Sequence, residues 1–218
     1  MTALGPYVRS FAAVIAAVAA SVLVLQYVLL IRATWDTAGP VSTTIRFFSY
    51  FTILSNLLVL LVSSTTAFAA GSAPGRWFAR PVARGGAALY IGVTMGIYAV
   101  VLQRLWQPQG AQWWADSGLH YAVPTLYLAW WLLAVPHGAL RWSDMLRWLL
   151  FPLLYVCWVF LRGAFVHEYP YPFIDLNAHD PATVLRNCAG VIAVFLLLGS
   201  VLVLVDRWRG VRQPVAAA

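Results

Sequence analysis

Six long apolar segments divide this chain, and they limit its fold more than any other feature. They cover about residues 10–31, 46–70, 86–106, 118–135, 145–163 and 183–205. A helix needs about 20 apolar residues to cross the hydrocarbon core of a bilayer, and these segments reach or approach that length. The longest linkers, 71–86 and 167–181, are too short for a separate domain. The sequence therefore predicts one all-α domain over residues 1–218, a polytopic integral membrane protein built as a bundle of six transmembrane helices.

The composition agrees with this class. Hydrophobic residues make up 62% of the chain and charged residues 10%, which leaves too little polar surface for a soluble globule. The first segment is longer than the apolar core of a typical signal peptide and lacks a clean cleavage site, so it is predicted to be a mature helix. Cys157 and Cys188 lie in or beside apolar segments, and they form neither a disulfide framework nor a metal-binding motif.

The arginines predict the orientation of the chain. The net charge of +7 arises from 14 basic residues, all of them arginine, and such an excess in a membrane protein marks cytoplasmic loops rather than a nucleic-acid partner. If the N-terminus is cytoplasmic, most arginines fall on that side: Arg9, Arg76, Arg80, Arg84, Arg141, Arg147, Arg207, Arg209 and Arg212. The opposite side keeps Arg32, Arg46, Arg104, Arg162 and Arg186 together with most of the acidic residues. The positive-inside rule therefore predicts that both termini are cytoplasmic.

Polar side chains interrupt the second apolar segment. Ser49, Thr52 and Asn56 are spaced by three and four residues, so they share one face of a continuous helix, and Ser55 lies beside them. Hydroxyl and amide groups are costly to expose to lipid tails, so this face is expected to turn toward the protein interior. Such groups either hydrogen-bond to neighbouring helices or line a site, and the polar face alone does not choose between the two.

The predicted topology brings a histidine to the same depth. At a rise of about 1.5 Å per residue, Thr52 lies about 9 Å along its helix from Arg46, and His120 lies about 6 Å beyond Asp116. Both helices run from the outside inward, so the two side chains are expected to share the outer half of the bundle. Histidine there is either a packed, hydrogen-bonded residue or a functional base.

Further polar groups are predicted near this depth. The loop with Tyr171, Pro172 and Phe173 opens on the outer side, and Tyr155 and Arg162 lie on one face of the fifth segment. Arg162 either reaches the membrane interface or binds an anionic head group.

Three sequence motifs resemble a known family of membrane proteins. They are FFSYFTILSNLL at 47–58, LHYAVPTLYLAWWLL at 119–133 and YPYPFIDL at 169–176. In this order on six helices they resemble the bacterial Pr6Pr family and, more distantly, the androgen-induced FAR-17a-like membrane hydrolases of animals. The resemblance covers about residues 10–206 and implies a bacterial inner-membrane location.

The resemblance also implies an activity. The animal proteins hydrolyse fatty acid esters of hydroxy fatty acids with a threonine and a histidine, which match Thr52 and His120 here. It therefore implies an intramembrane lipid-ester hydrolase that needs no cofactor, whose partners are membrane lipids and a long-chain acyl ester. The tyrosine–proline–phenylalanine element matches Tyr171, Pro172 and Phe173.

The residues fit this chemistry while leaving its details open. A threonine hydroxyl is a weak nucleophile until a base takes its proton, and histidine suits that role near neutral pH. Asp116 lies four residues before His120 and either caps the helix or supports the histidine. Oxyanion or head-group donors are sought among four residues, Ser49, Asn56, Tyr155 and Arg162, and the sequence does not choose between them.

The residues favour other functional classes less than the hydrolase. A small-molecule transporter or channel is disfavoured because no acidic residue lies near a predicted midplane and no inverted repeat is evident. A metal-dependent hydrolase would use His120, His167 and His179 with Asp175, but these residues form no compact ligand motif, so no metal site is predicted. A non-catalytic membrane protein is the third alternative, and the sequence leaves the oligomeric state open.

Overall fold

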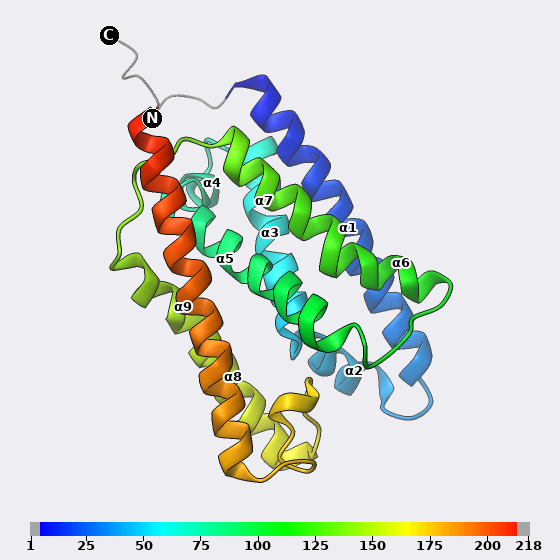
Figure 1. Cartoon of the computed structure of the whole chain (residues 1–218). Coiled ribbons are helices and arrows are strands. Elements are labelled where there is room, and N and C mark those ends of the chain that lie inside the picture. Colours follow the sequence, from blue (N-terminus) through cyan, green and yellow to red (C-terminus); the bar gives the residue numbers. More distant parts are fainter. Residues whose placement is uncertain (1–4, 213–218) are drawn as a thin grey trace.

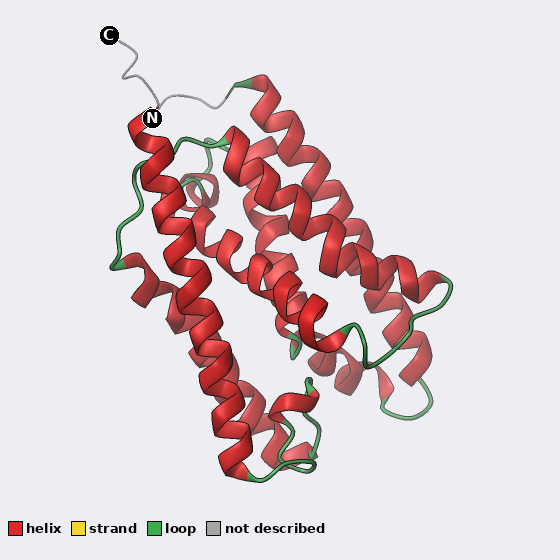
Figure 2. Ribbon diagram, viewed as in Figure 1, coloured by secondary structure: helices red, strands yellow, loops and turns green. Residues whose placement is uncertain are grey.

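The computed structural model describes residues 5–212, which form helices and loops without any strand (Figure 2). The α-helices are α1 (Pro6–Thr34), α2 (Gly39–Phe48), α3 (Phe51–Phe68), α4 (Ala73–Phe78), α5 (Pro81–Ile97), α6 (Ala111–Ser117), α7 (Val123–Ala134), α8 (Asp144–Val166) and α9 (Pro181–Arg212). Two π-helical turns, Tyr98–Leu102 and Gly118–Ala122, continue α5 and join α6 to α7, and a short 3₁₀ turn covers Pro172–Ile174. The predicted all-helical fold class is confirmed for the described residues.

Within residues 5–212, five helices are long and apolar enough to cross a membrane. They are Pro6–Thr34, Phe51–Phe68, Pro81–Leu102, Asp144–Val166 and Pro181–Val211. This set is what a helical membrane protein requires, but it is one fewer than the six predicted spans. The segment predicted at 118–135 is helical from Ala111 to Ala134, yet Asp116, Ser117 and His120 lower its hydropathy and a π-helical turn divides it.

The helices run back and forth along one bundle (Figure 1). α1 packs against α3, α3 against α5, and α5 against both α7 and α9, while α8 lies beside α9. Side-chain bonds tie the elements at the end where α1 begins. The Trp130 indole of α7 donates to the Val8 carbonyl of α1 at 3.1 Å, and the Trp148 indole of α8 donates to the Val82 carbonyl of α5 at 2.8 Å.

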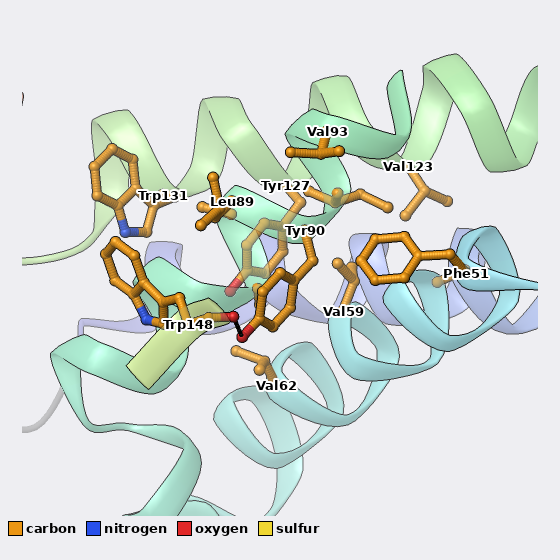
Figure 3. Packing of buried hydrophobic residues seen from close by; sticks show 14 of the residues in the cluster. Phe51, Val59, Val62, Leu89, Tyr90, Val93, Val123, Tyr127, Trp131 and Trp148 are labelled. Carbon is orange, nitrogen blue, oxygen red and sulfur yellow. Dashed lines mark hydrogen bonds between the residues drawn. The ribbon is translucent and has the colours of Figure 1, made fainter. Parts of the chain in front are cut away.

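Aromatic side chains fill the core between α3, α5 and α8. Phe51 and Tyr90 pack edge to face with ring centroids 6.2 Å apart, and the Tyr90 hydroxyl donates to the Trp148 carbonyl at 2.8 Å (Figure 3). A Cβ at Gly85 or Gly86 would approach the Trp148 ring to 2.8 or 2.9 Å, so glycine at these positions lets the indole lie against α5. This packing fixes the position at which α3 begins, and therefore the position of Thr52.

The continuous helix predicted over 46–70 is wrong. The chain ends α2 at Phe48 and begins α3 at Phe51, with Tyr50 in an extended conformation between them. Neither glycine nor proline causes the break. Instead, α8 stabilises it, because the Tyr155 hydroxyl donates to the Ser49 carbonyl at 3.0 Å and the Trp158 indole donates to Ser49 Oγ at 3.1 Å.

Candidate active site

The structure brings Thr52 and His120 into direct contact. Thr52 Oγ1 lies 3.3 Å from His120 Nε2, and both residues are buried. Thr52 belongs to the first turn of α3, and His120 belongs to the π-helical turn between α6 and α7. Thr52 was predicted to lie inside a continuous helix, but because of the break before Phe51 it lies at the start of α3. At the start of a helix the macrodipole favours negative charge.

Asp116 fixes the orientation of the His120 ring. His120 Nδ1 lies 2.9 Å from the Asp116 carbonyl oxygen and 3.3 Å from Asp116 Oδ1. Both neighbours are acceptors, so Nδ1 carries a proton and donates it to them, which leaves Nε2 of the neutral ring as an acceptor for the Thr52 hydroxyl. Asp116 therefore contacts the His120 ring through both its carbonyl and its carboxyl group.

Tyr98 completes the surroundings of this pair. Its ring stacks on the His120 ring with centroids 3.8 Å apart and an angle of 13° between the planes, and its hydroxyl donates to Asp116 Oδ2. No motif or spacing in the sequence distinguishes Tyr98 from the other tyrosines, so this residue was not predicted. Each of the two stacked residues lies in a π-helical turn, a local irregularity that occurs frequently at functional sites.

Tyr171 contacts Thr52 from the loop between α8 and α9. Its hydroxyl oxygen accepts a hydrogen bond from the Thr52 backbone N–H at 3.1 Å and lies 3.2 Å from Thr52 Oγ1. Burial raises the pKa of the Tyr171 phenol above its ordinary value, although the hydrogen bonds with Thr52 oppose this change. The phenol is therefore protonated at neutral pH and has a proton to donate.

Two cavities meet at Thr52 and Tyr171. The larger has a volume of about 560 Å³ and is lined by Asp116 and His120 as well as by Gln26, Gln112, Pro170 and Pro172. The smaller has a volume of about 110 Å³, lies between α5, α8 and α9, and is lined by apolar side chains such as Phe173, Val191 and Phe195. Thr52 and Tyr171 line both cavities, so the two spaces adjoin at these residues.

Asn56 holds the site together from within α3. Its Nδ2 donates to the Thr52 carbonyl at 2.8 Å and to the Leu119 carbonyl at 3.1 Å, and so links α3 to the π-helical turn that carries His120. Ser55 donates to the Thr52 carbonyl at 3.1 Å and lies 2.8 Å from the Thr94 hydroxyl of α5. The buried polar groups of α3 therefore serve both roles that the sequence left open.

Ser49 does not share a helical face with Thr52. It lies in the break before α3, where its hydroxyl donates to the Ile45 carbonyl at 2.7 Å. Tyr155 is committed to the Ser49 carbonyl. Arg162 pairs with Glu168 at 2.8 Å, and it lines neither cavity. Ser49 and Arg162 therefore stabilise the fold around the site, whereas Tyr155 also lines the smaller cavity beside Thr52 and Tyr171. None of the three has a hydrogen bond to Thr52 Oγ1 in the described residues.

The histidines of the alternative metal site do not assemble. Within residues 5–212, no group of three or more histidine, cysteine, aspartate or glutamate side chains is arranged to hold a metal ion. His167 follows α8 in a left-handed conformation, and Asp175 accepts a hydrogen bond from the backbone N–H of Asn177 at 2.7 Å. The three-histidine arrangement with Asp175 is therefore not formed.

No family model, curated protein or solved structure matches this chain.

Proposed function

We propose that the protein is an intramembrane hydrolase of lipid carboxylic esters, with Thr52 as the nucleophile and His120 as the general base. The observation that carries the proposal is the line of contacts from Thr52 Oγ1 through His120 Nε2 and Nδ1 to Asp116. A hydroxyl, an imidazole and a carboxylate in this order form the arrangement that activates a weak oxygen nucleophile.

The reaction has two halves. First, Thr52 Oγ1 attacks the ester carbonyl carbon while His120 Nε2 takes the hydroxyl proton. The ester C–O bond then breaks, and His120 returns the proton to the departing alkoxide, which leaves as an alcohol. In the second half, water attacks the acyl-threonine and gives its proton to His120. Collapse of this intermediate releases the carboxylic acid, and the proton returns to Thr52.

The two cavities support a substrate with apolar groups on both sides of its ester. The small apolar cavity suits a hydrocarbon chain, and the larger cavity, with Gln26 and Gln112 on its wall, suits a bulkier part with a polar group. A fatty acid ester of a hydroxy fatty acid has this form. Such a substrate is also what the resemblance to the Pr6Pr and FAR-17a-like families implies.

We further propose that the bundle spans a bacterial inner membrane six times. In this arrangement residues 111–134 form the sixth span, and both termini are cytoplasmic, although the termini themselves lie outside the described residues. The Asp116 and His120 side chains of this span are buried in the bundle. The site would then lie in the outer half of the membrane, where a lipid can enter sideways and water is near.

A fluorophosphonate probe tests the proposal directly. The purified protein, in detergent or nanodiscs, is expected to react through Thr52 Oγ1, which forms a P–O bond as fluoride leaves. Thr52→Ala is expected to abolish labelling and the hydrolysis of a long-chain acyl ester. The matched control is Thr65→Ala on the same helix, because the Thr65 hydroxyl bonds only to helix carbonyls, those of Leu61 and Val62. Equal labelling and equal hydrolysis by wild type and Thr52→Ala would refute the nucleophile assignment, and transport without hydrolysis would favour the transporter.

A further inference from the structure

An ester hydrolase needs a donor for the negative charge that develops on the carbonyl oxygen. In acyl transfer this donor is a preorganised N–H or O–H close to the nucleophile. The four residues considered from the sequence do not supply it. Ser49 and Arg162 bond elsewhere, and both N–H groups of the Asn56 amide are used by the Thr52 and Leu119 carbonyls. Tyr155 lines the smaller cavity beside Tyr171, but its one O–H donates to the Ser49 carbonyl.

Tyr171 lies where such a donor is required. Its hydroxyl is 3.2 Å from Thr52 Oγ1, and it lines both cavities at the point where they meet. A carbonyl carbon that approaches Oγ1 from these cavities brings its oxygen within reach of the same hydroxyl. No other side-chain O–H or N–H in the described residues has a hydrogen bond to Thr52 Oγ1 apart from His120, which has the role of base.

The hydrogen bonds around Tyr171 polarise it as a donor. His120 Nε2 accepts the Thr52 O–H, so the contact between Thr52 Oγ1 and Tyr171 has the phenol as its donor. The phenol oxygen in turn accepts the Thr52 N–H in the first turn of α3, at 3.1 Å. A hydroxyl that accepts one hydrogen bond donates a stronger one, and the positive end of the α3 dipole adds to this effect.

The loop that carries Tyr171 holds its ring rigidly. The ring stacks on Phe173 with centroids 5.5 Å apart and planes 6° apart, and it meets the Tyr50 ring edge to face at 6.0 Å. Asn187 of α9 donates to the Phe173 carbonyl at 2.8 Å and so ties the loop to the bundle. The hydroxyl is therefore positioned before any substrate binds, as electrostatic preorganisation requires.

We propose that Tyr171 is the oxyanion donor of the reaction, and this inference rests on the proposed function. As Thr52 Oγ1 forms its bond to the carbonyl carbon, the phenol O–H leaves Oγ1 and donates to the carbonyl oxygen. It keeps its proton throughout, while the proton of Thr52 moves to His120. The tetrahedral intermediate is then stabilised by the phenol, whose oxygen is still held by the Thr52 N–H.

Replacement of Tyr171 by phenylalanine tests this role. Tyr171→Phe is expected to lower kcat for a long-chain acyl ester by about 10²–10³-fold, the usual effect of losing one oxyanion donor, with little change in KM. Tyr169→Phe, on the same loop and outside both cavities, is the matched control and is expected to keep the wild-type kcat. A kcat for Tyr171→Phe equal to that of wild type would overturn the proposal. The proposed function fails separately, if wild type and Thr52→Ala do not differ.

A second variant covers the case in which Tyr171→Phe does not fold. Trifluorotyrosine at position 171 keeps the ring and the hydroxyl, but its phenol ionises at a lower pH and then no longer donates. The donor role predicts that kcat of this variant falls at the alkaline side of the pH profile, at lower pH than in wild type. An alkaline limb identical to that of wild type would overturn the proposal, because a merely structural phenol would not move it.

Discussion

Among the described residues, two buried histidine–aspartate pairs lie at opposite ends of the bundle, and only one of them has a hydroxyl group in contact with the histidine ring. His120 and Asp116 lie near the start of α3, beside the cavities. His137 and Asp206 lie where the loop after α7 packs on the end of α9, with His137 Nδ1 3.2 Å from Asp206 Oδ1. Both pairs are buried and have similar separations, so the chemistry of the pair itself does not distinguish them.

The difference is what the second nitrogen of each ring faces. His137 Nε2 faces the Leu132 carbonyl at 3.1 Å, so both nitrogens of that ring lie against oxygen acceptors of the protein itself. Asp206 also accepts the Leu140 N–H at 2.8 Å. His120 Nε2 instead faces the Thr52 hydroxyl. A histidine–aspartate pair therefore acts as a base only where one nitrogen is free to take a proton from a reacting group.

The largest expected effect is the difference in ester hydrolysis between the His120→Ala and His137→Ala variants. His120→Ala is expected to lower kcat/KM for ester hydrolysis by at least about 10³-fold, because the nucleophile loses its base. His137→Ala should leave the activity per folded molecule close to that of wild type. The Thr52→Ala, His120→Ala double variant should be hardly worse than either single one, since nucleophile and base act as a unit. Equal losses in both histidine variants, measured on folded protein, would remove the distinction.

Substitution of the two aspartates is expected to change kcat by less than substitution of His120. Asp116→Asn keeps the shape of the side chain but removes the charge that supports the protonated His120 ring, so kcat is expected to fall by about 10²–10⁴-fold. Asp206→Asn serves as the matched substitution at the other end, and its kcat should stay near the wild-type value. Steady-state kinetics in nanodiscs measures both. An unchanged kcat in Asp116→Asn would reduce Asp116 to a helix cap.

The two histidine variants should rank in the opposite order when thermal stability is compared: His137→Ala should be the less stable one. His137→Ala removes the partner of the buried Asp206 side chain and leaves that polar group partly unsatisfied in a closed packing site, so the variant is expected to lower the thermal unfolding midpoint clearly. His120→Ala should lower it less, because that ring borders a cavity rather than a closed packing site. Thermal unfolding in one detergent, followed by tryptophan fluorescence, gives the two values side by side. A larger drop for His120→Ala would contradict this order.

The smallest expected effect concerns alkaline pH. Because burial raises the pKa of Tyr171, its phenol keeps its proton, and its role as donor, below and somewhat beyond the ordinary value for tyrosine. Loss of the donor therefore begins only as the pH rises through the raised pKa. The kcat of wild type is expected to be level from about pH 8 to about pH 9.5, since tyrosine ordinarily ionises near pH 10. A decline within that interval, in protein shown to be folded, would argue against this donor.

The sequence was sufficient to predict that Thr52 and His120 share a depth. Helix rise, segment order and the arginine distribution together place them at one end of the bundle, and these depend only on local patterns. The break at Ser49–Tyr50 could not be predicted in this way. It lacks glycine and proline, and it is stabilised by Tyr155 and Trp158 from a helix more than a hundred residues later in the chain.

The residues around Thr52 and His120 were even harder to predict from the sequence than the helix break, because only tertiary packing brings them to the site. Tyr98 and Tyr171 come from different parts of the chain and contact the site through their hydroxyls or rings, which no spacing in the sequence encodes. Ser49, Asn56, Tyr155 and Arg162 are polar and therefore look like donors in the sequence, but in the fold their donor groups already form other hydrogen bonds. That Tyr171 is the donor nearest to Thr52 Oγ1 follows only from the three-dimensional contacts.

The π-helical turn at Gly118–Ala122 makes the site sensitive to the length of the chain. A π turn contains one residue more than the α turn it replaces, so deletion of a single residue there would restore a regular helix. Each residue of an α-helix advances the rotation by about 100°, and the deletion would turn Asp116 by that amount relative to α7. A homologue one residue shorter in this turn would keep Asp116, His120 and Thr52 in its alignment and still lose their contact. Insertions and deletions at this turn are therefore a better guide to function among related chains than the identity of the three residues.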